Sequence, residues 1–577
     1  MISKMDKVIK WFVILSGGGA VLYLQLLSMF GTSYATTRIF GTVDGKPDMD
    51  GYNYCLADNI WVHFWVICGF ILIVYLVGRF ICPLVKADPK WISAVIGTVY
   101  FSAGAWLILS LQLHPNSDSA KILSIAEQMV NGQYDAFQAG EGYLWRYPDQ
   151  LGIICFYYLI TLLFGSRNFL VIQFVNLGAA TAIGFLARKI CSVMWKEAKW
   201  TGIGVQLLYS LFSPLFFYIT YIYGTIPGVS LSLAAIYCEL LFLRRKKLKY
   251  AIEAAIFIGL AVIMKTNSLV MMVAMIIFLV YDLIMENQRA KTAIALIFIL
   301  VFPMIFTEGI HAFMGSKANS EISRGMPKLS WVAMALQESR MAPGTWNGYS
   351  VSLYEAAGYD YDKTNQLAIN SIKDSLEHFE SDKSEALRWL GRKMAFQWND
   401  PFFGAAEMIR GRESEIGLSS FLDSMINGRL YYWLRIYLNY LQTIILTGTL
   451  LYFFSKESRQ KREKLILLVV FLGGFLFHIV WEAKREYVLP YFLMLFPYAV
   501  RGYQIIAYRL RELFHGERYL NKRKIIYFLG GAVIGIFIWS TLYPTRLIQY
   551  TVAVRDEEEL RIPVEEDIKK RTFVVKD

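Results

Sequence analysis

Charged residues are scarce in this sequence: Asp, Glu, Lys and Arg together make up 18% of it, whereas apolar residues make up 56%. In a soluble globular protein the charged share approaches about a quarter. Apolar runs of roughly 20 residues, the length that a helix needs to cross a hydrocarbon core, recur along the chain, for example at 61–84, 91–113, 169–187 and 525–542. The sequence therefore predicts an all-α polytopic membrane protein.

The sequence also lacks the patterns of metal, redox and nucleic-acid chemistry. Its six cysteines are scattered, with neither metal-ligand spacing nor an obvious disulfide pair. The net charge of +12 comes from short basic clusters between apolar runs, where they set membrane topology, so nucleic acid is not an expected partner. No repeat of fixed period is visible, which weakens the case for a transporter built from inverted halves. We expect no cofactor and no essential divalent metal.

Basic residues in the short loops predict the orientation of the spans. They cluster at residues 4–10, 86–90, 188–199, 244–249, 289–291, 456–464 and 501–524. Placing every cluster in the cytoplasm predicts about 13 spans, with the N-terminus inside and the C-terminus outside. The first apolar run exceeds the roughly 7–15 residues of a signal-peptide core, so we expect a retained first span. The apolar stretch 150–165 is short, and we expect an interfacial or re-entrant helix there.

This topology divides the chain into five parts. They are residues 1–90, two spans with an outer loop at 31–59; 91–308, a transmembrane core with a catalytic outer loop at 114–167; 309–430, an extracytoplasmic domain; 431–543, the C-terminal transmembrane helices; and 544–577, an extracytoplasmic tail. The third part has helical patterning at 361–376 and 383–396, after a glycine-rich loop at 341–349. We expect a small ordered helical insertion there.

The catalytic outer loop of the core places a carboxylate where a span leaves the membrane. His114 and Asp118 lie four residues apart, just before an amphipathic helix with apolar positions between 120 and 130. Asp118 has two interpretations: a helix N-cap, a position that Asn, Ser and Asp favour, or a catalytic carboxylate. The local sequence leaves both open.

The same loop continues with charged and aromatic residues, among them Glu141, Arg146, Tyr147 and Asp149. Aromatic side chains are common at membrane interfaces, where they anchor a protein in the bilayer. A loop rich in carboxylates and aromatic rings is also suited to holding sugar hydroxyls and a lipid head group. Both interpretations stay open at this point.

A second group of ionisable residues lies at the outer end of a later span. His478, Glu482 and Arg485 recur at helical spacing and would share one face if the helix were continuous. One interpretation of this group is snorkelling, with a local Glu482–Arg485 ion pair. The other is binding of a lipid phosphate, for which Lys484 and Arg485 are suitable donors. Lys265, at the outer end of a helical hairpin, is likewise either a snorkelling residue or a further cation of the site.

Three motifs follow one another along the chain. They are Asp118 after an early span, Tyr147-Pro before a short apolar helix, and Arg485-Glu-Tyr487 followed by Pro-Tyr. Their order and membrane placement resemble the GT-C glycosyltransferases, and most of all glycosyltransferase family 39, the branch of the protein O-mannosyltransferases and lipid A aminoarabinose transferases. The resemblance covers residues 91–310 and 465–500. The chain departs from that branch in its two additional N-terminal spans, its single Asp instead of an Asp-Glu pair, and its outer domain between spans.

The resemblance implies a GT-C-like bundle and a membrane glycosyltransferase that takes a sugar from a polyprenyl-phosphate donor at the extracytoplasmic face. Asp118 would be the general base, Lys484 and Arg485 would stabilise the leaving phosphate, and Arg146 is a further candidate for that role. Attack from the face opposite the phosphate predicts inversion at the anomeric carbon. The residues expected to bind substrate are His114, Glu141, Arg146, Tyr147, Asp149, Lys265, Glu482, Lys484, Arg485 and Tyr487.

The expected partners are the lipid-linked sugar, membrane lipids, and an acceptor that is a cell-envelope glycan, lipid or protein. Two alternatives stay open on the sequence alone. One is a lipid-linked glycan polymerase or ligase, which is still an enzyme at the same face. The other is a lipid-linked glycan transporter or flippase, for which ionisable residues near the middle of the bilayer would be typical.

Overall fold

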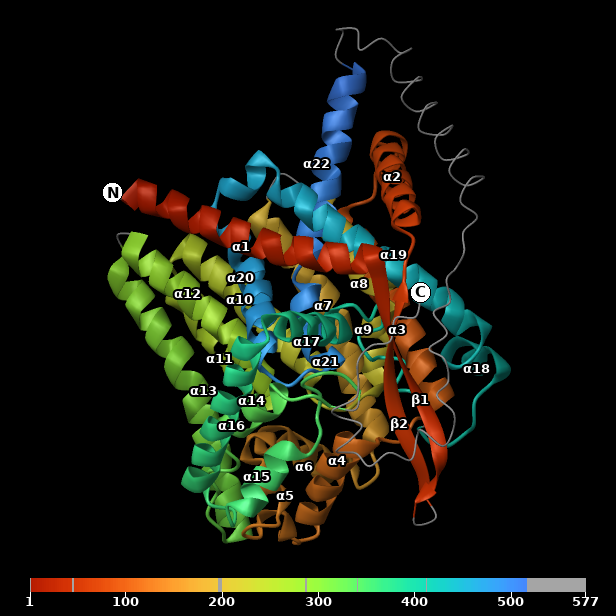
Figure 1. Ribbon diagram of the computed structural model, residues 1–577. Helices are drawn as coiled ribbons and strands as arrows, with labels where there is room; N and C mark the ends of the chain where they lie inside the picture. Colours follow the sequence, from red (N-terminus) through yellow and green to blue (C-terminus); the bar gives the residue numbers. More distant parts are fainter. Residues whose placement is uncertain are drawn as a thin grey trace.

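The computed structural model describes residues 2–43, 46–195, 200–285, 288–339, 341–410 and 412–515. Most of this part of the chain is helical, and the helices pack into one elongated bundle (Figure 1). The predicted class, an all-α polytopic membrane protein, is confirmed. The span expected at 525–542 and the tail expected at 544–577 lie outside the described residues.

Within the described ranges, nine helices are long and apolar enough to cross a bilayer. They are α1 (Ile2–Phe30), α2 (Ile60–Leu76), α3 (Pro89–Leu111), α7 (Phe169–Met194), α10 (Thr225–Arg245), α12 (Leu269–Met285), α13 (Arg289–Ala318), α19 (Arg429–Phe453) and α20 (Ile466–Val480). A tenth span results if α8 (Thr201–Leu211) and the segment that follows it, bent by 59°, count as one. The expected number of about 13 is therefore not confirmed.

The short apolar stretch expected at 150–165 forms α6 (Leu151–Phe164). Its 14 residues would rise only about 21 Å, less than the roughly 30 Å of a hydrocarbon core. The helix is thus too short for a full span, as expected from the sequence.

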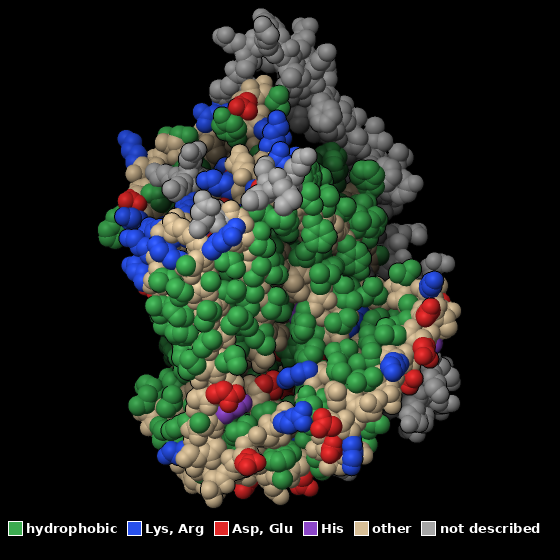
Figure 2. Space-filling model, turned by 90° about the vertical axis from the view of Figure 1, so that its left-hand side faces the viewer, with side chains coloured by type: hydrophobic (Ala, Val, Ile, Leu, Met, Phe, Trp, Pro, Cys, Tyr) green, Lys and Arg blue, Asp and Glu red, His purple; other side chains and the backbone are tan. Residues whose placement is uncertain are grey.

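The surface of the bundle has the polarity that a bilayer demands. Figure 2 shows a broad band of hydrophobic side chains between one end where Lys and Arg gather and an opposite end of mixed charge. Large apolar side chains such as Trp91 on α3 and Met304 on α13 are exposed on the bundle. Exposing such an apolar band to water costs free energy, whereas exposing it to lipid does not, so these helices face the hydrocarbon.

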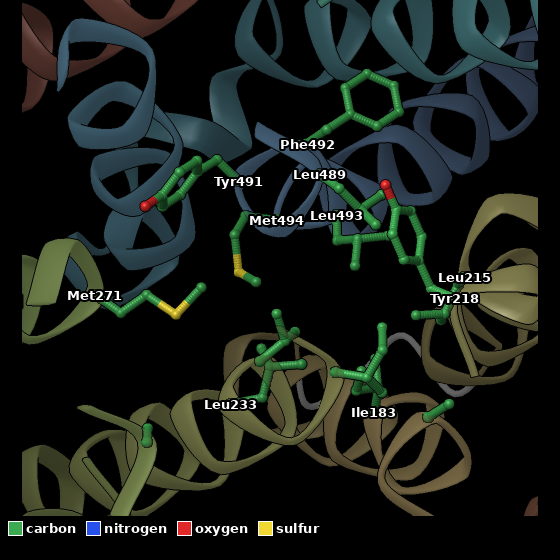
Figure 3. Close-up of a cluster of buried hydrophobic side chains, with 14 of the residues drawn as sticks. Ile183, Leu215, Tyr218, Leu233, Met271, Leu489, Tyr491, Phe492, Leu493 and Met494 are labelled. Carbon is green, nitrogen blue, oxygen red and sulfur yellow. The ribbon is translucent and has the colours of Figure 1, made fainter. Parts of the chain in front are cut away.

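The centre of the bundle is formed by α10, which is buried over most of its length between α7, α11 (Leu248–Met264) and α12. Figure 3 shows part of this core, in which Ile183 of α7, Leu233 of α10 and Met271 of α12 face the short helix α21 (Arg485–Leu493). A short helix with irregular ends therefore lies inside the apolar core. The segment that precedes α21 is thereby placed beside the ends of the surrounding helices.

The outer loop expected at 31–59 contains a β-hairpin, which the all-α prediction did not include. Strands β1 (Gly31–Val43) and β2 (Lys46–Ala57) pair antiparallel and project from the ends of α1 and α2 (Figure 1). The base of the hairpin is attached to the insertion between α13 and α19, since the amide of Ser33 donates to the Asn399 carbonyl over 2.9 Å.

The insertion between α13 and α19 is helical, as expected. It holds α14 (Lys328–Ala335), α15 (Tyr349–Ala356), α16 (Tyr361–Ser381), α17 (Lys383–Trp398) and α18 (Ser420–Ile426). The helices predicted at 361–376 and 383–396 are confirmed, and both begin after an aspartate whose side chain caps the first turn, Asp360 and Asp382. Helix α13 continues to Ala318, beyond the predicted start of the insertion at 309.

Helices α19 and α22 (Phe496–His515) pack closely because glycines face each other between them. A Cβ added at Gly502 would overlap the carbonyl oxygen of Gly448, whereas a Cβ at Gly309 of α13 would have no neighbour within 4 Å. Small residues at such crossings let two backbones approach closely.

We therefore expect Gly502→Ala to push α22 away from α19 and to destabilise the protein by about 1–3 kcal/mol, the usual cost of overpacking. Gly309→Ala, the same change in open space, should leave stability unchanged or slightly raised. Thermal unfolding of the purified protein in detergent compares the two. Equal melting temperatures for both variants would contradict the packing described here.

Candidate active site

Asp118 lies in the first turn of α4 (Ser117–Val130), which follows α3 after a short loop. The cap of this helix is Asn116, whose amide donates to Ser119 Oγ over 3.1 Å while that hydroxyl donates to the Asn116 carbonyl over 2.6 Å. The N-cap interpretation of Asp118 is therefore wrong. Its side chain is exposed, and Oδ2 accepts a hydrogen bond from the Tyr223 hydroxyl over 3.3 Å.

Tyr223 precedes α10 in an irregular segment that packs tightly on the end of α11. The next residue, Gly224, has φ +77°, and a Cβ there would overlap the carbonyl oxygen of Met264. Only glycine fits both the left-handed backbone and this close approach. The contact brings Tyr223 beside Lys265, whose Nζ lies 3.7 Å from the centre of the tyrosine ring.

Two lysines share two tyrosine rings in this site. Lys484 Nζ lies 5.6 Å from the ring centre of Tyr223 and 5.1 Å from that of Tyr487, and Lys265 Nζ is also 5.1 Å from Tyr487. The faces of aromatic rings attract cations, which stabilises both ammonium groups in a half-buried place. Lys484 also forms an ion pair with Glu486 at 2.9 Å. The result is a pair of cations held side by side.

The protonation states of Glu482 and Lys265 change near neutral pH. Burial, with the neighbouring carboxylates of Glu486 and Asp118, raises the pKa of Glu482 to about 7. Burial lowers the pKa of Lys265 to about 8. For Lys484, the Glu486 carboxylate and the surrounding tyrosines outweigh burial and hold the pKa well above its usual range. The site therefore keeps one permanent cation and changes its net charge between mildly acidic and mildly basic pH.

The backbone around the site is held by buried polar side chains from other elements. Gln173 of α7 and Arg412 of the insertion both donate to the Leu113 carbonyl, over 3.0 and 3.1 Å, and both donate to the Thr220 carbonyl, over 3.1 and 3.0 Å. Arg412 Nε further donates to the His114 carbonyl over 2.7 Å. These bonds tie the loop before Asp118 to the segment before Tyr223.

The condition for a shared helical face of His478, Glu482 and Arg485 is not met, because the helix is not continuous. Helix α20 ends at Val480 and α21 begins at Arg485. Between them the amide of Ala483 donates to the Gly344 carbonyl of the insertion over 2.7 Å instead of bonding within a helix. This break turns Glu482 and Lys484 toward the site.

Arg485 is part of the scaffold that carries the site. It is buried, its Nε lies 3.4 Å from Asp400 Oδ2 and donates to the Phe396 carbonyl over 3.3 Å, and its guanidinium covers the Phe396 ring. Asp400 also accepts from the amides of Phe402 and Gly404 over 3.0 and 2.8 Å. The local Glu482–Arg485 ion pair considered from the sequence is replaced by this buried pair across the insertion.

Three other predicted site residues have partners outside this cluster: His114 pairs with Glu415 at 3.0 Å, Arg146 with Glu355 at 3.2 Å, and Asp149 with Lys328 at 3.1 Å. A fourth, Glu141, is exposed. Tyr147 lies nearer the cluster: its ring centre is 5.0 Å from that of Tyr143 and 6.0 Å from that of Trp331 on α14.

The structure thus brings together five of the predicted residues. They are Asp118, Lys265, Glu482, Lys484 and Tyr487, with Tyr147 at the edge. Sequence reasoning missed Tyr223, Glu486 and Arg412. The signal for Tyr223 was present, as an aromatic residue followed by glycine at the start of a span, but an interfacial tyrosine is common enough to hide it.

No group of three potential metal ligands occurs in the described ranges. The two residues whose spacing suggested a cation site have different contacts, His114 with Glu415 and Asp118 with Tyr223. What the cluster can do is bind an anion through Lys265 and Lys484 next to an exposed carboxylate that can accept a proton.

Few known proteins match this chain. No family model and no curated protein match the chain. AglB, the oligosaccharyltransferase of Archaeoglobus fulgidus, in complex with an inhibitory peptide and a dolichol-phosphate, is 12% identical with a TM-score of 0.40, and the match covers 78% of this chain and 55% of that one. The apo form of the Archaeoglobus fulgidus oligosaccharyltransferase is 10% identical with a TM-score of 0.40, covering 79% and 55%. This chain spans about half the length of both, and the resemblance to family 39 stays a prediction.

The charges of the site predict how anion binding depends on pH. Raising the pH from about 6 to 9 deprotonates first Glu482 and then Lys265, so the site becomes more negative by two charges. A phosphodiester lipid keeps one negative charge over this range, and its affinity should fall by roughly tenfold or more, equivalent to about 1.4 kcal/mol.

Binding of a fluorescent polyprenyl phosphodiester, followed by titration at each pH, measures this effect. Glu482→Gln should make the fall smaller, because Glu482 no longer adds a negative charge as the pH rises. Glu380→Gln, at an exposed position on α16, is the matched control. A profile that is flat in the wild type, or unchanged in Glu482→Gln, would contradict this description of the site.

Proposed function

We propose that this protein is a membrane glycosyltransferase that moves a sugar from a polyprenyl-phosphate donor to an extracytoplasmic acceptor of the cell envelope. Asp118 is the general base, and Lys265 and Lys484 bind the phosphate. The donor lipid lies along the apolar helices with its head group at the cluster, and the acceptor reaches the exposed side of Asp118.

One observation carries the proposal: a base and a cation contact the same tyrosine. Asp118 accepts from the hydroxyl of Tyr223, and Lys265 lies over the ring of Tyr223. A sugar linked to phosphate presents its anomeric carbon one bond away from the phosphate oxygen. A phosphate on the lysines therefore places the reacting carbon within reach of an acceptor oxygen that contacts Asp118.

The reaction needs no group beyond these. The acceptor oxygen forms a bond to the anomeric carbon while the bond from that carbon to the phosphate oxygen breaks. Asp118 takes the proton of the acceptor hydroxyl, a step worth about 10²–10⁴ in rate when the base is positioned. The electron pair of the broken bond stays on the polyprenyl phosphate, whose additional charge Lys265 and Lys484 stabilise. Attack opposite the phosphate inverts the anomeric carbon.

The cations of this mechanism differ from those expected from the sequence. Arg485 is held by Asp400, and Arg146 by Glu355 and the Gly140 carbonyl. Lys265 takes the place of both, because its ammonium lies beside Lys484 on the same two rings. Compact ammonium groups suit a phosphate whose charge changes during the reaction, since each presents three donors in adaptable directions.

Transport of the lipid-linked sugar is less well supported than its transfer. A transporter would place its ionisable residues part-way along spans, near the middle of the bilayer. Here Lys265 lies between α11 and α12, and Glu482 and Lys484 lie between α20 and α21. These groups sit at helix ends, next to a helical insertion that can bind an acceptor.

The proposal predicts that Asp118→Asn abolishes transfer, lowering kcat by about 10²–10⁴ while donor affinity is kept. Purified protein is incubated with a panel of polyprenyl-phosphate sugars, and donor consumption and product are followed by mass spectrometry. Asp135→Asn is the matched control, since it makes the same change at an exposed site in the same loop.

The control should retain wild-type turnover, and both variants should elute as the wild type does in size-exclusion chromatography. Turnover that is unaffected by Asp118→Asn would overturn the assigned base. Flipping of donor lipid in proteoliposomes by both the wild type and Asp118→Asn, without any sugar release, would favour the transporter instead.

A further inference from the structure

A large groove lies between helices α2, α8, α19 and α22, away from the candidate active site. It has a volume of about 1440 Å³, and its walls are mostly apolar, with Ile73 of α2 and Leu207 and Leu211 of α8 among the lining residues. All three of these side chains are exposed although they lie on apolar, bundle-forming helices. Figure 1 shows α2 standing apart from most of the bundle.

The groove exists because α2 is attached along only part of its length. His63 Nδ1 is 2.9 Å from Thr443 Oγ1 of α19, and the ring centre of Phe70 lies 4.8 Å from that of Tyr503 on α22. Beyond Phe70, α2 runs to Leu76 and is followed by the helical turn Val77–Ile81, and most of this stretch is exposed. Packed interiors leave few voids larger than a water molecule, and an apolar cavity of this size in a membrane fills with hydrocarbon chains.

Arginines line one end of the groove. Arg501 forms an ion pair with Glu457 at 2.7 Å. Of the other charged lining residues, Arg79, Arg509 and Arg511 are basic and Glu512 is acidic, which leaves this end positive. Arg501, Arg509 and Arg511 belong to the basic stretch that begins at 501 and that the sequence places in the cytoplasm.

We propose that the groove is a binding site for an anionic glycerophospholipid. The acyl chains lie between α2 and α8, and the phosphate lies at Arg509 and Arg511. Basic pockets between transmembrane helices on the cytoplasmic side are suited to anionic head groups, because the arginines add to the attraction of the apolar walls.

The site is separate from the candidate active site. Helix α22 begins at Phe496, three residues after the end of α21, and Arg511 lies about 22 Å further along it at 1.5 Å per residue. A lipid in the groove would brace α2 against α8, which share few contacts of their own. The proposal therefore does not depend on the glycosyl transfer proposed above.

Native mass spectrometry of the delipidated full-length protein tests the proposal, with 1-palmitoyl-2-oleoyl phosphatidylglycerol or the phosphatidylcholine of the same chains added back. The wild type should bind one phosphatidylglycerol at least tenfold more tightly than phosphatidylcholine. The double variant Arg509→Gln/Arg511→Gln should lose this preference. The double variant Arg289→Gln/Lys291→Gln, at exposed basic residues at the start of α13, should keep it.

A second variant tests the apolar part of the groove. Gly69 lines it, and a Cβ there would have no neighbour within 4 Å, so the side chain of Gly69→Phe starts in open space and extends into the groove. This variant should bind both lipids at least tenfold more weakly than the wild type does. The proposal would be overturned if the wild type bound the two lipids with equal affinity, or if binding were unchanged in Arg509→Gln/Arg511→Gln or in Gly69→Phe. A dimer that forms in place of the lipid complex would overturn it as well.

Discussion

The site depends on one constraint: irregular backbone beside an apolar interior must have its carbonyl groups hydrogen-bonded, because no water is there to do it. Gln173 and Arg412 meet this need together, each donating to the carbonyls of Leu113 and Thr220. Asn176 of the same helix as Gln173 adds a bond of 2.9 Å to the Tyr221 carbonyl. Two chain segments that could not otherwise leave their helices at this depth are thereby fixed side by side. One carries Asp118 and the other carries Tyr223.

The electrostatics of the cluster follow from that placement. Asp118, Glu482 and Glu486 bring negative charge to a place of low polarity, and Lys265 and Lys484 balance it on the rings of Tyr223 and Tyr487. The carboxylates are not equivalent: Asp118 is exposed, whereas Glu482 and Glu486 are buried. Burial explains why the pKa of Glu482 rises to about 7. An exposed carboxylate is the one that an acceptor can reach, and the buried ones tune the cations that face the phosphate.

Much of the helical architecture could be predicted from the sequence, because apolar length and caps are local signals. The helices at 361–376 and 383–396 and the short apolar helix near 150–165 are examples. Asp118, Lys265 and Lys484 were predicted too, since charges at the ends of apolar runs are conspicuous. The break at 481–484 was not, because a distant carbonyl at Gly344 competes for the amide of Ala483. The roles of Arg485 and Arg412 depend likewise on Asp400, Leu113 and Thr220, partners that lie far away in the sequence.

In the proposed mechanism the cations bind the phosphate and the carboxylate performs the proton transfer. Equilibrium binding of polyprenyl phosphate, the product of the proposed reaction, tests it most directly in the wild type, Lys265→Gln, Lys484→Gln and Asp118→Asn. Each lysine variant is expected to bind at least about tenfold more weakly, and Asp118→Asn to bind as tightly as the wild type or more tightly, because a negative charge has been removed. Lysine variants that bind as the wild type does, or an Asp118→Asn variant that loses binding, would contradict it.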